Sequence, residues 1–145
     1  NNFFETFTSL SDREITLRYY INSLVDTSKE YYVISSLKKD KADFNHEFCH
    51  AKYLLNESYR KEVNSYIETI PKEIYYALCS DLIDLGYNNE EKILLDEINA
   101  YLATSSRRYL GQIFDIKYDK IETYHKYLTK MFKDIKKGID INIII

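Results

Sequence analysis

Residues that break helices are scarce in this sequence, and this scarcity limits the possible folds more than any other feature. The 145 residues include three glycines and one proline. Because glycine and proline are the residues that most disfavour a helix interior, long stretches of the chain are free to stay helical. We therefore expect a mainly α fold. The length is typical of one domain, so a single domain is expected over residues 1–145, whether the chain is complete or a piece of a longer one.

Apolar periodicity and the residues at helix ends divide the chain into expected helices. The first helix begins at a capping box formed by Ser11 and Glu14. Pro71 suits the first turn of a later helix, and Gly86 suits a left-handed stop at the end of that helix. The predicted helices span residues 12–26, 42–55, 57–70, 71–85, 89–112 and 117–137.

One internal segment favours a β-strand instead. Residues 31–37 are rich in aromatic and β-branched side chains, which are enriched in strands. We expect this segment to be a minimal β element, followed by a helical bundle. The apolar tail at residues 139–145 is expected either to add a short strand or to pack on the surface.

Charge and composition exclude several classes of protein. The formal net charge is −3 and there is no basic stripe, so nucleic-acid binding through phosphate neutralisation is not expected. No run reaches the roughly 18 apolar residues that a transmembrane segment needs. These features fit a soluble protein, either cytoplasmic or secreted as an effector. Cys49 and Cys79 are the only cysteines and do not form a CxxC pair, so two free, mostly buried thiols are predicted.

Residues 46–50 carry the motif with the clearest chemistry, His-Glu-Phe-Cys-His. This is the HExxH pattern, and it falls on the predicted helix over residues 42–55. Histidines at positions i and i+4 project from the same helical face, so both imidazoles can bind one metal ion. Glu47 lies one residue beyond the first histidine, where it is placed to act as a base on water activated by the metal.

The helix that carries this motif is expected to separate its apolar residues from the residues that bind the metal. Its apolar stripe lies apart from the stripe that holds the two histidines, so we expect one side to be packed and the other to present the imidazoles. The members of the apolar stripe are Phe44, Phe48, Ala51 and Leu55, and Tyr53 lies with the histidines.

Glu97 is the candidate for a third ligand. It lies in an apolar stripe of the predicted helix over residues 89–112, with Ile98 and Tyr101 among its neighbours. A lone buried charge is costly, and a bound cation would remove that cost. Alternatively, Glu97 sits at the edge of the stripe and pairs with a lysine or arginine. The other possible third ligands are Asp96, Asp115 and His125.

The string His46-Glu47-Phe48-Cys49-His50, followed by Glu97-Ile98-Asn99-Ala100, resembles zinc metallopeptidases of the gluzincin type. The resemblance implies that His46, His50 and Glu97 bind Zn²⁺ and that Glu47 is the catalytic base. It also implies a zincin-like catalytic domain, with residues 31–37 as the edge strand that aligns the substrate.

The sequence departs from that family's pattern in three respects. Lys52 replaces the apolar residue usual two positions after the second histidine, and Asp43 is less typical three positions before the first. Most of the N-terminal sheet of a full zincin is missing. No third histidine occurs near position 56, which excludes the metzincin subclass.

These observations predict a zinc metalloprotease, a hydrolase whose partner is a peptide or protein substrate. Asp96 is expected to steady a histidine N–H. Tyr101, Tyr109 and His125 are the candidates for stabilising the transition state. A first alternative is a non-catalytic helical module that binds a partner protein through exposed tyrosines, with the HExxH pattern coincidental or a structural metal site. A second is a zinc hydrolase of another amide or of an ester.

Overall fold

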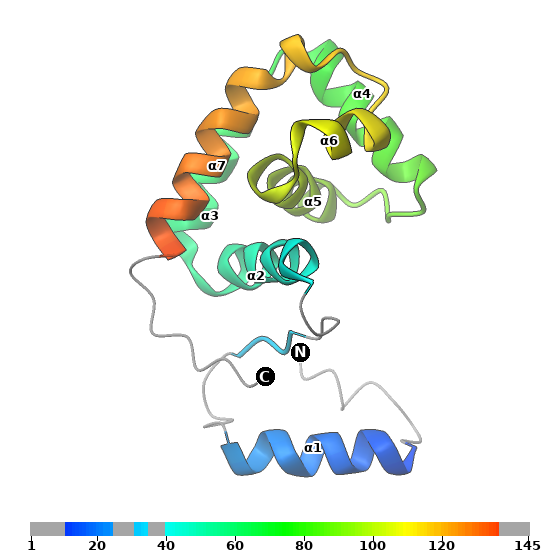
Figure 1. The fold of residues 1–145 in the computed structure, drawn as a ribbon, viewed down its shortest axis with the longest axis vertical. Coiled ribbons are helices and arrows are strands. Elements are labelled where there is room, and N and C mark those ends of the chain that lie inside the picture. The colour runs from blue at the N-terminus through cyan, green and yellow to red at the C-terminus, as the bar shows by residue number, and fades with distance from the viewer. Residues whose placement is uncertain (1–10, 25–30, 35–39, 137–145) are drawn as a thin grey trace. The chain divides into compact units, whose positions relative to one another are not determined.

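The computed structural model describes residues 11–24, 31–34 and 40–136. Within these residues the chain forms seven α-helices and one 3₁₀-helix, so the mainly α prediction is confirmed (Figure 1). The chain divides into two compact units, residues 1–32 and 33–145. None of the helices in these described segments is both long and apolar enough to cross a membrane.

The first unit contains helix α1, Asp12–Leu24. Its start is fixed as the capping box predicts. The Ser11 amide donates to the Glu14 carboxylate at 2.7 Å, and the Glu14 amide lies 3.4 Å from the Ser11 hydroxyl. The two contacts satisfy backbone donors that the first turn of a helix otherwise leaves without partners.

In the second unit, helix α5 (Glu91–Thr104) is the central element. It packs against α2, α3, α4 and α7, and Figure 1 shows these helices arranged around it. Its Ile98, Ala100 and Leu102 are fully buried, which makes α5 the main contributor to the core. The other elements are α2 Lys41–Leu55, α3 Glu57–Ile67, α4 Lys72–Asp84, α6 Arg107–Ile113, η2 Tyr118–Lys120 and α7 Glu122–Lys136.

The long helix expected over residues 89–112 is interrupted. The α5 helix ends at Thr104, and α6 begins at Arg107. Ser105 and Ser106 both adopt extended backbone angles, and the Ser106 hydroxyl accepts a hydrogen bond from the Tyr109 amide at 3.2 Å. Serine side chains compete for backbone hydrogen bonds and favour caps, so this pair ends one helix and begins another.

The edge strand expected at residues 31–37 is not found in its described part. Residues 31–34 have no regular secondary structure, and residues 35–37 lie outside the described residues, as does the tail at 139–145. A strand needs a second strand to complete its backbone hydrogen bonds, and the described residues contain none. Ile34 packs its side chain against the helical core. The zincin-like part of the fold prediction therefore stays a prediction.

Gly86 ends α4 in the left-handed conformation that the sequence predicts, with φ at +100°. Its amide donates to the Ile83 carbonyl, and the Tyr87 amide donates to the Leu82 carbonyl, at 2.9 and 3.1 Å. This is the Schellman pattern, in which glycine avoids the strain that a Cβ would cause. The turn also directs the chain towards α5, because the next residue, Tyr87, contacts Tyr101 of that helix.

Replacing Gly86 with alanine is expected to lower the free energy of unfolding by about 1 kcal/mol, because alanine is strained at positive φ. Gly111 is the matched control, since it lies inside α6 and a Cβ added there would meet no other atom within 4 Å outside the helix's own backbone. Gly111→Ala should raise the free energy of unfolding by about 0.5–1 kcal/mol. Urea unfolding monitored by circular dichroism measures both changes. Equal effects of the two substitutions would contradict the assignment.

Candidate metal centre

Helix α2 places the two histidines of the motif one turn apart. Its start is fixed by Asp40, whose carboxylate accepts hydrogen bonds from the amides of Ala42 and Asp43 at 3.1 and 3.0 Å. From this start, His46 and His50 fall on the face of α2 that meets α5. Their ring centroids are 4.8 Å apart and the rings are nearly perpendicular, at 84°.

Helix α5 brings Glu97 to the same point. One carboxylate oxygen lies 3.6 Å from His46 Nε2, and the other lies 3.6 Å from His50 Nε2. One ligand atom from each of the three residues lies within 4.8 Å of the others. A tetrahedral ion about 2 Å from each ligand atom would separate these atoms by about 3.3 Å, so small side-chain movements complete the geometry.

Asp96 contacts the second histidine from the outer side. Its Oδ2 lies 3.1 Å from His50 Nδ1. With the proton on Nδ1 donated to this carboxylate, His50 Nε2 is left with its lone pair available for a metal. The contact that the predicted role of Asp96 requires is therefore present.

Two carboxylate oxygens at this point have unmet hydrogen-bonding capacity. Asp96 Oδ1 and Glu97 Oε2 are buried and have no hydrogen-bond partner among the described residues. A buried carboxylate oxygen without a partner is costly, and a cation between Glu97 and the two imidazoles would satisfy Oε2. The three residues thus fit a divalent metal ion. They offer three ligand atoms of types that bind such ions, and one carboxylate oxygen among them has no hydrogen-bond partner.

The electrostatics at His50 favour positive charge. Burial lowers the pKa of the His50 imidazole, but the carboxylates of Asp96, Glu97 and Glu47 outweigh burial and raise the pKa above its ordinary value. Burial raises the pKa of Asp96, and His50 opposes that rise only in part. The negative charges of Asp96, Glu97 and Glu47 near His50 form a field that attracts a cation.

Tyr101 and Tyr87 form one wall of the site. The Tyr101 ring packs edge-on against the His46 ring, with centroids 4.8 Å apart, and its hydroxyl lies 3.0 Å from the Tyr87 hydroxyl. Burial, followed by the hydrogen bond to Tyr101 and the charge of Glu97, raises the pKa of Tyr87. Tyr109 is one ring further out, stacked on Tyr101 with centroids 6.4 Å apart.

Tyr87 was not among the residues that the sequence indicated. Its position depends in part on the glycine turn after α4, which the local sequence indicates. It depends also on the packing of that turn against α5, which the local sequence does not indicate. The chain also contains fifteen tyrosines, so composition does not indicate which of them lies at the site.

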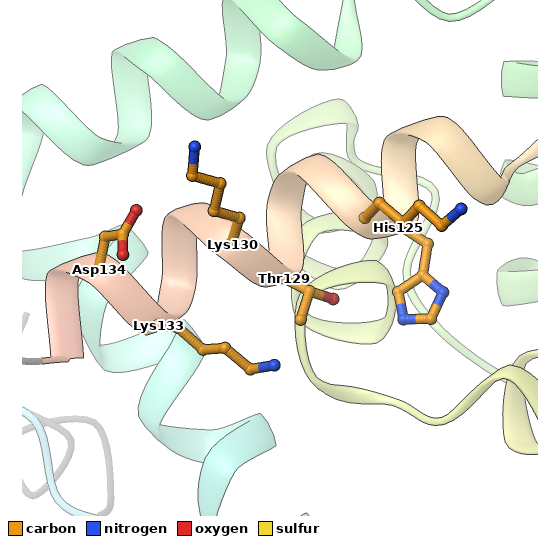
Figure 2. Close-up of a pocket in the computed structure, with 6 residues that line it drawn as sticks. His125, Thr129, Lys130, Lys133 and Asp134 are labelled. Atoms are coloured by element: carbon orange, nitrogen blue, oxygen red, sulfur yellow. The ribbon is translucent and has the colours of Figure 1, made fainter.

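His125 does not join the cluster. Its Nδ1 lies 2.6 Å from the Tyr118 hydroxyl of η2. Figure 2 shows it on α7, in a pocket that is also lined by Thr129, Lys130 and Lys133. Burial lowers the pKa of His125. The structure therefore places His125 with Tyr118 and the α7 pocket, and not in the group formed by the two histidines and Glu97.

Asp115 is also placed away from the cluster. It is exposed, and its backbone amide donates to the Asp81 carboxylate at 2.9 Å. Of the candidates for third ligand, the structure therefore groups only Glu97 directly with both histidines, and Asp96 supports one of them.

The face of α2 that presents the two histidines is itself packed against the core. The histidine face packs against α5, which leaves His50 8% exposed and Tyr53 6% exposed, whereas Leu55 of the apolar stripe is 37% exposed. The reason is geometric, because a ligand from a second helix requires that helix to pack on the histidine face. His46, with a side chain 19% exposed, is the more open ligand.

The two cysteines are free and buried, as predicted. Burial raises the pKa of the Cys49 thiol to about 12, so the thiol is neutral. Neither cysteine belongs to the group of possible metal ligands. Lys52, the departure from the family pattern, is 4% exposed, and burial lowers its pKa.

No known protein family, curated protein or solved structure shows significant similarity to the chain. The chemistry of the site therefore has to be argued from its own residues and their geometry.

Proposed function

We propose that this chain is a zinc-dependent metallopeptidase whose ligands are His46, His50 and Glu97. One observation carries the proposal. Two helices far apart in the sequence place two imidazoles and a carboxylate within 4.8 Å of one another. The Asp96 carboxylate beside His50 Nδ1 supports it, because zinc-binding histidines almost always donate their second N–H to such a group.

The donor set favours zinc. Two histidines and one glutamate are a known ligand set of catalytic zinc sites, which leave a further position open. Bound zinc would supply a Lewis acid that polarises a substrate carbonyl and lowers the pKa of water towards about 7. The same donors also suit non-haem iron, but Glu47 beside the first ligand is the arrangement of a hydrolase.

The chain's own residues then divide the work. Glu47 is half-buried on α2, next to His46, where its carboxylate can take a proton from the attacking water and deliver it to the leaving amine. Tyr101, which touches the His46 ring, is the candidate donor to the oxygen that becomes negative in the transition state. The hydroxyl of Tyr87 positions the Tyr101 hydroxyl through the hydrogen bond between them.

A purely structural metal site is the alternative that one observation favours. The described residues contain no strand on which an extended peptide could align, and residues 31–34 do not supply one. In that case the ion would tie α2 to α5 without performing chemistry. Metal content supports either reading, and only activity separates them.

Removing the metal is the first test. We expect the purified protein to hold about one zinc per chain by elemental analysis, and dialysis against a chelator to lower its melting temperature. A ligand at a hundred times its Kd stabilises a fold by about 2.7 kcal/mol, which corresponds to roughly 5–10 °C for a chain of this size. Adding zinc back should restore the melting temperature.

The same samples should be tested against a library of peptides. The loaded protein should cleave some members, the chelated protein none, and cleavage should return with zinc. No bound zinc and no gain in melting temperature on adding it would favour a non-catalytic interaction module. Zinc binding with hydrolysis of other amides or esters alone would favour a different zinc hydrolase.

A further inference from the structure

Three polar side chains meet in the core directly behind the candidate metal ligands. They are Cys49 of α2, Tyr59 of α3 and Asn99 of α5, with exposed fractions of 0%, 2% and 0%. The Asn99 amide donates to Cys49 Sγ at 3.2 Å, and the Tyr59 hydroxyl donates to Asn99 Oδ1 at 3.1 Å. The Tyr59 hydroxyl also lies 3.5 Å from Cys49 Sγ. This group is called the polar triad below.

The polar triad lies very close to the ligands along both helices. Cys49 immediately precedes His50, and Asn99 follows Glu97 by two residues. Apart from the triad, the fully buried side chains of the described residues are apolar, with Ile98 and Leu102 among them. Apolar contacts have no directional preference, whereas hydrogen bonds require a particular distance and angle.

A divided ligand set needs a fixed alignment of its two helices. His46 and His50 belong to α2 and Glu97 to α5, so sliding or rotating either helix separates the ligand atoms. A shift of α5 by one residue would turn Asn99 by about 100° about the helix axis and leave its amide buried without partners. A single buried asparagine is known to select one register between packed helices in this way.

We propose that the polar triad is a positioning device that holds α2 and α5 in the register at which the three ligands converge. This inference rests on the proposed metal site. In this role the triad sets the affinity of the site for zinc and the coordination geometry of the bound ion. The role is separate from the contribution of the three residues to the stability of the fold.

Two substitutions remove hydrogen bonds of the triad. Asn99→Leu keeps the number and branching of the side-chain heavy atoms, and Tyr59→Phe removes only the hydroxyl. Tyr53→Phe is the matched control, because the Tyr53 hydroxyl is also tied by a hydrogen bond, 2.6 Å to Asn64, but this bond joins α2 to α3 and does not reach α5. Zinc affinity is measured by competition with a chromophoric chelator. Cobalt is then substituted for zinc, and its visible spectrum reports the coordination geometry.

We expect Asn99→Leu to weaken zinc binding about tenfold or more, the range found when groups that support metal ligands are lost. Tyr59→Phe should weaken it about threefold to tenfold, and both should change the cobalt spectrum. Tyr53→Phe should bind zinc within about twofold of the parent and keep its spectrum. If Asn99→Leu fails to fold, the positioning role is tested by Tyr59→Phe and by the pair Cys49→Ser and Cys49→Ala. The Cys49→Ser variant should then bind zinc more tightly than the Cys49→Ala variant.

A loss of melting temperature in the metal-free variants, with parental zinc affinity and cobalt spectrum, would overturn the positioning role and leave a structural one. A parent protein that binds no zinc would overturn the proposed metal site itself. The two failures are distinguishable, because the second is seen in the parent before any variant is made.

Discussion

Replacing Glu97 with alanine is expected to weaken zinc binding by about a hundredfold or more. Zinc-finger peptides bind structural zinc with apparent free energies of about 10–16 kcal/mol through four protein ligands, so one ligand of that kind accounts for roughly 3 kcal/mol. At about 1.4 kcal/mol for each tenfold change, this corresponds to the expected factor. The carboxylate of Glu97 is also the one that contacts both histidines among the described residues, whereas Asp96 contacts only His50.

The effect of Glu97→Ala on the melting temperature should depend strongly on whether zinc is present. In the chelated protein Glu97→Ala should change the melting temperature little, because relief of the unpartnered Oε2 offsets the loss of the contacts with the two histidines. In the zinc-loaded protein the same change should remove most of the stabilisation that zinc provides. Elemental analysis and thermal unfolding, each with and without chelator, measure both effects.

Glu91→Ala is the control for this experiment. Glu91 is an exposed acidic residue on the same helix, outside the group of possible ligands. It should leave both zinc affinity and the metal-dependent melting temperature unchanged. If Glu97→Ala retained zinc as well as Glu91→Ala does, then the third ligand would be another residue and the proposed site would be wrong.

The features that the sequence predicted depend on local rules. The capping box at Ser11, the glycine stop at Gly86 and the i, i+4 pair His46 and His50 are all set within about one helical turn. Glu97 is the exception, because it was inferred from a conflict between its charge and its apolar neighbours. That conflict is visible without knowing the packing partner.

The features that were missed depend on packing between elements. The contact of Tyr87 with Tyr101 requires the turn after α4 to lie against α5, and the buried position of Asn99 requires α2 and α3 to meet α5. No periodicity encodes these contacts. The burial of the histidine face of α2 has the same origin, because the sequence places His46, His50 and Tyr53 on one stripe without showing which helix packs on it.

The strand expected from residues 31–37 shows the limit of composition as evidence. Aromatic and β-branched residues indicate a strand only where a neighbouring strand can complete its hydrogen bonds, and the described helices provide apolar surface instead. Ile34 packs on that surface. The divided long helix is a similar case, since Ser105 and Ser106 are tolerated in helices and only their backbone angles reveal the break.

Replacing Glu47 with glutamine should abolish most of the activity and leave the metal in place. Glutamine has nearly the same shape but cannot accept the proton, and a positioned general base contributes about 10²–10⁴-fold to rate. We therefore expect kcat to fall about a thousandfold on a peptide identified in the library screen. Zinc affinity should stay within about threefold of the parent, because Glu47 is not in the ligand group.

Asp43→Asn is the matched control for the Glu47 experiment, because Asp43 is an exposed acidic residue three positions before His46 on the same helix. Asp43→Asn should preserve both kcat and zinc content. That result would show that losing a negative charge near the motif does not by itself cause the fall in kcat expected for Glu47→Gln. Equal cleavage by Glu47→Gln and the parent would exclude Glu47 as the base. A chain that binds zinc through its two helices and yet cleaves no peptide, ester or other amide in either form would instead be stabilised by a structural ion. Activity of the parent and its dependence on Glu47 therefore separate a metallopeptidase from a helical module that uses the same three ligands.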